Sequence, residues 1–354
     1  MNEREKYIYG IINSNAALEL FTTLDSKHLT GFTPNGSCET ERVYTIPYQD
    51  ISAVVSDSVA ADCVHLRKDV LARLLVKHQK TIEKIMDSGF GIVPVKLGTI
   101  ASNEVEVGDI LEKGYGLIKD IMGKISDKIE IDLVATWSDF SSILKEVGQE
   151  KEVKEFKDKL LANPVEVTVD DQMRVGVMVK KALDKKRERY AQKMQNHLKA
   201  ITQDFKTHEP MDDKMVANFA FLINKAKHKD FEKMVEELNN EWLEKLNFRC
   251  VGPLPAYSFY TLEVKKWQFQ EIDWARKKLR LMNDFATKDE IKKAYKALAF
   301  SSHPDKNPNT PGIEREFDEI TKAYGVLWEY CLTEACSFSE EEFKKNAIMV
   351  KVKE

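Results

Sequence analysis

Cysteine is scarce in this chain of 354 residues, and the five that occur are Cys38, Cys63, Cys250, Cys331 and Cys336. Their spacings match neither a zinc site nor a disulfide framework, which is the usage expected in a reducing cytoplasm. No apolar run approaches the roughly 20 residues that a membrane-spanning helix needs, and the first residues lack the apolar core of a signal peptide. These absences predict a cytoplasmic protein without membrane insertion.

The charge balance and the motif content argue against two further classes. The chain carries 54 Lys and Arg against 58 Asp and Glu, a net charge of −4, whereas nucleic-acid binders usually show a basic excess. The segment Gly89-Phe90-Gly91 lacks the third glycine of a dinucleotide loop, and there is no phosphate loop, Gly-x-Ser-x-Gly or His-Glu-x-x-His motif. We therefore expect a protein that is not an enzyme, with no catalytic residue, cofactor, metal ion or nucleic-acid partner.

The pattern of apolar residues begins with an α/β unit. A strand at 6–13 is followed by a short helix, two strands, a longer helix with apolar residues at three- and four-residue spacing, and a last strand. The ranges expected after the short helix are 42–46, 51–56, 66–88 and 92–95. This order, β-α-β-β-α-β, is the ferredoxin-like pattern. A further helix at 103–125 leads out of the unit.

A second unit repeats this order of elements without a sequence repeat. Strands are expected at 129–137, 215–223, 248–251 and 258–264, with a helix at 228–245. A long helix at about 170–206 interrupts the unit, because its apolar residues recur at helical spacing. The predicted fold class is α+β, with two ferredoxin-like α/β units, the second carrying a long helical insertion, followed by a small all-α helical hairpin.

This pattern divides the chain into four segments. The first two are the α/β units at 1–126 and 127–266, and the helical insertion in the second covers about 150–206. Residues 267–336 form the helical hairpin. Residues 337–354 are polar, and we expect a partly mobile tail there.

The hairpin segment carries the most specific motif of the chain. Thr287 and Glu290 form a capping box, so a helix is expected to begin at Lys288. Its inward stripe is followed by His303-Pro304-Asp305, and a residue before proline is pushed out of helical geometry. The tripeptide is therefore expected on a turn, before a second helix at about 312–330.

This arrangement resembles a J-domain (DnaJ-like), the module by which a co-chaperone engages an Hsp70-type ATPase. The resemblance implies that the turn and the basic face of the preceding helix contact the ATPase. The residues concerned are His303, Pro304, Asp305, Lys292, Lys293 and Lys296. The sequence departs from the family at Ser301 and Ser302, which replace a basic residue and an aromatic one, and at Arg280, which stands where a glycine is usual. The family's fourth helix is missing, so a J-fold kept only for docking stays open as an alternative.

Four separated blocks in the front of the chain, in the expected order, resemble the gas vesicle protein F/L family (GvpF/GvpL-like). They are Tyr7–Ile11, His78–Met86, Gly91–Thr99 and Gly252–Phe259. The resemblance covers about residues 5–265 and implies a cytoplasmic accessory protein of gas vesicle assembly that binds the apolar shell subunit. His78 itself is expected to be a buried structural histidine.

Basic residues outside the hairpin are candidates for contacts with the shell subunit. Lys96 lies in an apolar strand, where it either protects a sheet edge or meets an acidic group of a partner. The long helix carries a basic run that is either a solvated face or a contact surface. The candidates in that run are Lys185, Lys186, Arg187 and Arg189.

Three hypotheses follow for the function. In the first, the protein is an assembly chaperone that binds the shell subunit, works with other gas vesicle accessory proteins and recruits Hsp70 through the J-like hairpin. In the second, it is a minor structural component of the vesicle whose J-fold is only a docking element. In the third, it is a general Hsp70 co-chaperone that is indifferent to the shell subunit.

Overall fold

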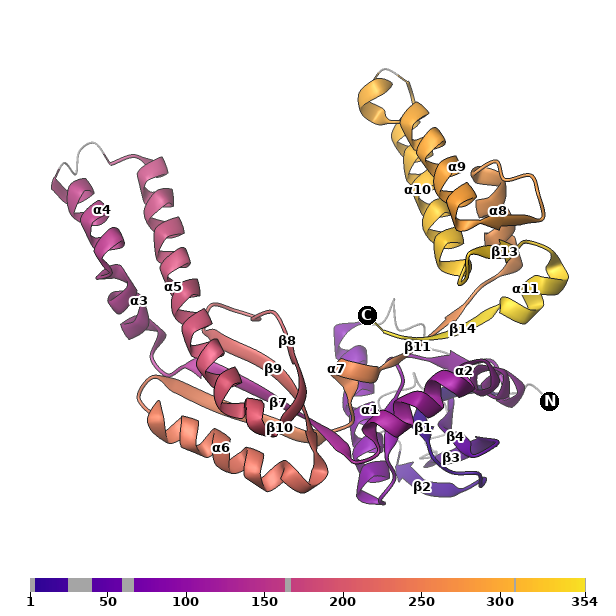
Figure 1. Ribbon diagram of the computed structural model, residues 1–354, viewed down its shortest axis with the longest axis horizontal. Coiled ribbons are helices and arrows are strands. Elements are labelled where there is room, and N and C mark those ends of the chain that lie inside the picture. Colours follow the sequence, from indigo (N-terminus) through magenta and orange to yellow (C-terminus); the bar gives the residue numbers. More distant parts are fainter. Residues whose placement is uncertain (1–3, 25–39, 59–66, 163–166, 309, 354) are drawn as a thin grey trace, which may run out of the picture.

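The computed structural model describes residues 4–24, 40–58, 67–162, 167–308 and 310–353. Cys38 and Cys63 lie outside the described residues. The described chain forms two bodies built on antiparallel sheets and a helical hairpin, each with its own buried core (Figure 1).

The first body is a six-stranded sheet with two helices. Its strands are β1 (Glu5–Ile12), β2 (Glu19–Leu24), β3 (Thr40–Tyr48), β4 (Ile51–Ser58), β5 (Ile92–Pro94) and β6 (Ile100–Ala101). Its helices are α1 (Lys68–Asp87) and α2 (Glu104–Ile125). The spatial order of the strands is β2-β3-β4-β1-β5, and β6 also pairs with β1.

The two helices cover opposite faces of this sheet, and β1 is therefore buried on both sides. Tyr7 and Tyr9 pack with residues of α1, whereas Ile8 and Ile11 pack with residues of α2. The helix predicted at 66–88 is confirmed, and Gly89 follows it with a φ of 89°. A positive φ of this kind is the reason that glycine is favoured just after a helix.

The order of elements differs from the predicted β-α-β-β-α-β pattern. Strand β2 stands where the sequence predicts a short helix, and it pairs with β3. The antiparallel hydrogen bonding with β3 fixes the extended backbone there. The mixed helix-and-sheet class is confirmed, whereas the ferredoxin-like detail is not confirmed.

The second body is a four-stranded sheet in the order β10-β7-β9-β8. Its strands are β7 (Lys128–Trp137), β8 (Thr202–Thr207), β9 (Met215–Asn224) and β10 (Leu246–Leu254). Its helices are α3 (Phe140–Gly148), α4 (Lys151–Ala162), α5 (Val169–Leu198) and α6 (His228–Glu241), with short 3-10 turns at Lys199–Ile201 and Lys225–Lys227. Alternate apolar residues of β7 face the helices, so the predicted half-buried strand is confirmed.

The long helix ends eight residues earlier than the sequence predicts. Helix α5 stops at Leu198, and Thr202–Thr207 forms β8 on the edge of the sheet. Phe205, which continues the helical spacing in the sequence, instead stacks on Phe221 of the neighbouring strand at 6.2 Å between ring centroids. Pairing with β9 therefore overrides the helical periodicity at this point.

Helices α3, α4 and α5 form an arm that projects from the second sheet (Figure 1). The Thr168 side chain and Asp171 cap the start of α5 reciprocally. Across the described ranges, no helix is apolar over a length that would cross a bilayer.

The last part of the chain is a helical hairpin held between two paired strands. The strand predicted at 258–264 is instead helix α7 (Tyr257–Tyr260) followed by β11 (Leu262–Lys266). Then come α8 (Phe269–Lys278), β12 (Phe285–Thr287), α9 (Lys288–Ser301), a 3-10 turn (Pro304–Lys306), α10 (Ile313–Tyr330), β13 (Ala335–Ser337), α11 (Glu340–Asn346) and β14 (Ile348–Val352). The prediction of a mobile tail at 337–354 is wrong, because β14 pairs with β11 over five residues.

Candidate functional site

The helical hairpin has a continuous apolar core that fixes its three helices. Ile272 of α8, Ile291 of α9, and Ile320 and Leu327 of α10 are almost fully buried together. Tyr295 of α9 stacks on a tyrosine of α10 at 4.2 Å between ring centroids. These contacts hold α9 and α10 side by side, so that the turn between them is presented at the tip.

Helix α9 begins at the residue predicted from the sequence. The Thr287 hydroxyl accepts a hydrogen bond from the Glu290 N–H at 3.2 Å, and the Glu290 carboxylate accepts one from the Thr287 N–H at 2.8 Å. These Thr287 hydrogen bonds hold the pKa of Glu290 below its usual value. The capping box is thus confirmed, and it fixes the register of the basic residues along α9.

The tip of the hairpin is a short turn built around His303. Its Nδ1 accepts a hydrogen bond from the Asp305 N–H at 3.2 Å, and its ring packs edge-on against Phe317 of α10 at 5.3 Å between centroids. The Asn307 amide donates to the carbonyls of Ser301 and His303. His303 is therefore held in place, whereas the Asp305 side chain is 89% exposed.

The basic face of α9 is open to solvent. Lys292, Lys293 and Lys296 are all exposed. Within the described part of the chain, none of the three forms an ion pair, whereas Lys278 of α8 bonds Glu319 of α10 at 2.8 Å. The hairpin therefore uses Lys278 for internal support and leaves three exposed positive charges on α9, whose contact with an acidic partner stays a prediction.

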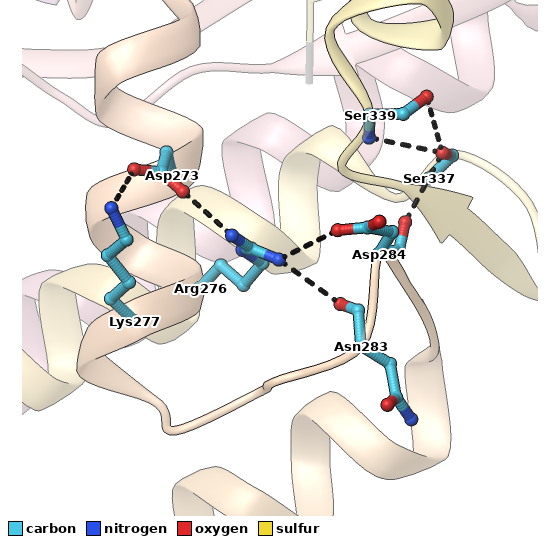
Figure 2. A network of polar contacts seen from close by, with 7 residues as sticks. All are labelled: Asp273, Arg276, Lys277, Asn283, Asp284, Ser337 and Ser339. Carbon is cyan, nitrogen blue, oxygen red and sulfur yellow. Dashed lines mark hydrogen bonds and ion pairs between the residues drawn. The ribbon is translucent and has the colours of Figure 1, made fainter.

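The connection between α8 and α9 is held by a polar network (Figure 2). The Arg276 guanidinium bonds Asp273 at 3.0 Å and Asp284 at 3.1 Å, and the Asp284 carbonyl accepts a hydrogen bond from the Ser337 hydroxyl at 3.3 Å. Arg280 takes a left-handed backbone with a φ of 57°. An arginine thus occupies the conformation that favours the glycine usual in the family.

A two-stranded ribbon of β11 and β14 fixes the base of the hairpin, and sequence reasoning missed it. Lys265 of β11 forms an ion pair with Glu329 of α10 at 2.5 Å, and the Trp267 ring packs edge-on against Tyr330. Strand β14 lies on α2 so closely that a Cβ at Gly114 would be 3.0 Å from the Val350 side chain. The alternating apolar residues Ile348, Val350 and Val352 were the signal for this strand.

The candidate shell contacts outside the hairpin divide into paired and open residues. Lys96 forms an ion pair with Glu263 of β11 at 2.5 Å. Lys186 pairs with Glu146 of α3, and Arg187 is 9% exposed with its guanidinium bonded to Asp184 and to the Asp213 carbonyl. Lys185 and Arg189 are exposed and have no ion pair among the residues described.

A buried polar cluster lies where the two sheet-based bodies meet, and its partners could not be recognised from the sequence. Glu130 of β7 is 1% exposed and accepts hydrogen bonds from the N–H and the hydroxyl of Ser258, both at 2.8 Å. The same hydroxyl contacts His208 at 3.2 Å. Burial raises the pKa of Glu130 to about 7. On α7, next to Ser258, the Tyr257 hydroxyl bonds Gln79 of α1 at 3.1 Å, so this helix ties the two bodies together.

His78 is a buried structural histidine, as the sequence predicts. Its Nδ1 is 2.8 Å from the Tyr7 hydroxyl, and the side chain is enclosed between α1 and the first sheet. Burial lowers the pKa of His78 to about 4. The residue therefore supports the packing of α1.

The fold and its elements can now be compared with known proteins. The family model "Gas vesicle synthesis protein GvpL/GvpF" matches residues 5–261, and the model of the DnaJ domain matches residues 277–330. Gas vesicle protein F of Nostoc sp. is 22% identical over 189 residues, which cover 53% of this chain and 77% of that protein. Gas vesicle protein F of Dolichospermum flosaquae is 20% identical and is covered to 98%, against 67% of this chain.

A solved structure shows the same fold in the front of the chain. The crystal structure of the gas vesicle protein GvpF from Anabaena sp. superposes with a TM-score of 0.58 at 20% identity, covering 73% of this chain and 98% of that one. The hairpin is similar to the chaperone protein DnaJ of Prosthecochloris aestuarii, with 60% identity over 42 residues, which span only 11% of that protein. The chain belongs to the gas vesicle synthesis protein GvpL/GvpF family and carries a DnaJ domain at its C-terminal side.

Proposed function

We propose that this protein is an assembly chaperone of gas vesicles that binds the apolar shell subunit and brings an Hsp70-type ATPase to it. The observation that carries the proposal is the presence, in one chain, of a GvpL/GvpF body and a DnaJ domain with an exposed tip. A protein that only built the vesicle would have no need for a module whose exposed residues suit an ATPase partner.

The geometry of the hairpin supports recruitment of Hsp70. His303 is fixed by Phe317, Asp305 projects into solvent, and Pro304 holds the turn between them. Lys292, Lys293 and Lys296 offer three exposed positive charges on the helix that leads to this turn. Such a surface suits an acidic partner, because complementary charge speeds encounter and fixes orientation.

The position of the DnaJ domain relative to the GvpL/GvpF body supports action of Hsp70 on a client that is bound to that body. The hairpin is joined to the first body through β11 and β14 rather than through a flexible linker. The helical arm and the hairpin project on the same side of the sheets (Figure 1). An ATPase bound at the hairpin tip would therefore face the space beside the arm, where exposed Lys185 and Arg189 are the remaining candidates for contacts with the shell subunit.

We further infer that the protein acts in the cytoplasm, in association with gas vesicles and their other accessory proteins. This inference rests on the family of the front body and on the cysteine usage of the chain. Lys96, which pairs with Glu263, would have to exchange that partner to contact the shell subunit, so Lys185 and Arg189 are the better sites for mutation.

Parallel pull-downs with purified shell subunit and purified Hsp70 test the proposal. Wild-type protein should bind both, and His303→Gln should lose Hsp70 while keeping the shell subunit. A protein that binds no shell subunit and leaves its aggregation unchanged would remove the chaperone function. Vesicles washed stringently give the contrast with a structural role, because stoichiometric retention of this protein would favour a vesicle component.

A further inference from the structure

We propose that a pocket between the two sheet-based bodies is the docking site for an apolar peptide segment of the client that carries a carboxylate. This inference rests on the proposed function and names a surface for it. The junction pocket has a volume of about 370 Å³ and is lined by residues of both bodies. A volume of this size accepts one or two large side chains.

Two blocks that mark the family in the sequence meet in this pocket. Phe90, Gly91 and Ile92 line it from the first body, at the start of β5. Pro253 and Pro255 line it from the end of β10, more than 160 residues further along the chain. Family-like motifs on two separate bodies thus build one concave surface, which is a stronger sign of a binding site than either motif alone.

The apolar walls are held in place by the packing around them. Ile92 is 3% exposed in the core beneath α1. Ile129 at the start of β7 is 4% exposed in the core of the second body. The hydrogen bonds from Ser258 to Glu130 and from Tyr257 to Gln79 lie just beyond Pro255 and keep the two bodies together. The pocket is therefore formed before a partner arrives, which lowers the entropic cost of binding.

The charges around the pocket select a carboxylate. Lys128, Lys225 and His228 line it, against one acidic residue, Asp87. The Lys128 ammonium is already bonded to Asp127 at 2.8 Å. The Lys225 ammonium donates to the Ser126 carbonyl at 3.2 Å and forms no ion pair among the described residues, although its charge also acts on the nearby Asp127. Lys225 is therefore the cation most available to an acidic group of the occupant.

A peptide segment fits these walls better than a free metabolite. The apolar walls suit large side chains, and the basic edge lies on the solvent side, where the rest of a protein client would continue. Binding one large apolar side chain contributes about 1.5–3 kcal/mol, and a charge-assisted hydrogen bond contributes about as much. One apolar side chain and one charge-assisted hydrogen bond suffice to anchor a client that also binds at other surfaces.

Filling the pocket tests the proposal. A Cβ at Gly91 meets no atom within 4 Å, so Gly91→Phe places a ring in the pocket without a clash at the Cβ. A Cβ at Gly116, an exposed residue of α2 outside the pocket and outside the arm, also meets nothing within 4 Å, which makes Gly116→Phe the matched control. Binding of purified shell subunit to the full chain should weaken about tenfold or more in Gly91→Phe and stay within about twofold in the control.

A charge-reversal variant gives a second measurement that does not depend on filling the pocket. Lys225→Glu changes an exposed residue at the edge of the pocket, in the 3-10 turn before α6, and Lys229→Glu makes the same change four residues later, in the first turn of α6. Only the first should weaken binding of the shell subunit, by about tenfold, and the loss should shrink at high salt. Thermal unfolding of each variant checks that its fold is intact.

The outcomes distinguish a failure of the pocket proposal from a failure of the proposed function. Wild-type protein that binds no shell subunit overturns the proposed function and this inference with it. Wild-type binding that is equal in Gly91→Phe and Lys225→Glu overturns the pocket alone. Binding of a free apolar carboxylate such as decanoate, blocked by Gly91→Phe while the shell subunit still binds, would assign the pocket to a small molecule and also overturn the inference.

Discussion

At Glu130 and His78, burial shifts two titrations in opposite directions. Burial raises the pKa of Glu130 to about 7 and lowers that of His78 to about 4, whereas the unfolded chain has values near 4.3 and 6.5. As the pH falls from 7 to 4.5, the folded state binds a proton at Glu130 that the unfolded state does not, which stabilises the fold. Over nearly the same range, the unfolded state binds a proton at His78, which destabilises the fold.

These two effects oppose each other in the wild type, so removing one of them exposes the other. In Glu130→Gln the gain at Glu130 is removed while the loss at His78 stays, and the free energy of unfolding should fall by about 2–3 kcal/mol between pH 7 and pH 4.5 beyond the wild-type change. Urea denaturation at several pH values measures this. A variant whose pH profile runs parallel to that of the wild type would show that Glu130 does not titrate in this range.

Arg280 gives a second prediction at the scale of one residue. A non-glycine residue at a φ of 57° is strained, so Arg280→Gly should raise the free energy of unfolding of the hairpin by about 0.5–1 kcal/mol. Arg315→Gly in the exposed face of α10 is the control, because glycine inside a helix should lower it by about 1 kcal/mol. Chemical denaturation followed through the hairpin tryptophans distinguishes the two, and a loss in Arg280→Gly would contradict the account.

At the scale of the element, the basic face of α9 carries the expected ATPase contact. Lys292→Glu, Lys293→Glu and Lys296→Glu together should weaken binding of Hsp70 by about tenfold or more, since like charges would face the acidic partner. The same number of reversals at the exposed lysines 229, 233 and 245 of the second body controls for net charge. Titration of Hsp70 by fluorescence anisotropy gives both values, and equal losses would assign the effect to overall charge.

Strand β14 carries a prediction about how the hairpin is held. Removing residues 348–354 deletes the partner of β11 and exposes the apolar side of α2. We expect a loss of about 3 kcal/mol in the free energy of unfolding of the first body, from the apolar surface returned to water. Removing only 353–354 is the control. Small-angle scattering should also show a more extended molecule for the longer deletion, and an unchanged profile would mean that α8 alone orients the hairpin.

The sequence predicts those elements well whose local pattern and tertiary setting agree. The capping box at Thr287 places the start of α9, and the alternation in 129–137 places β7. The prediction from the sequence fails where pairing with a partner strand determines the secondary structure. Phe205 continues a helical spacing but lies in β8, and β2 and β14 are strands because β3 and β11 pair with them. Long-range pairing of this kind leaves little trace in a local window.

The candidate site follows the same rule. The residues of the tip and of the basic face could be named from the sequence because they lie within one short segment. The contacts of Glu130 with Ser258 and of Lys96 with Glu263 join positions that are 128 and 167 residues apart. A single sequence offers no way to place such residues together. The junction pocket could not be predicted for the same reason.

At the scale of the whole molecule, the proposed function makes the protein a connector between a client and an ATPase. The GvpL/GvpF body has a pocket at its junction and an arm with exposed basic residues, and the DnaJ domain has an exposed tip. The β11–β14 ribbon holds the two ends in one orientation, so a client and an ATPase would meet at a fixed geometry.

The measurement that tests this connection most directly is a three-component pull-down with tagged shell subunit, untagged Hsp70 and this protein in the presence of ATP. We predict that Hsp70 is recovered with the shell subunit only when wild-type protein is added, and that His303→Gln is itself recovered but brings no Hsp70. Recovery of Hsp70 that is equal with His303→Gln, or without this protein at all, would contradict the account.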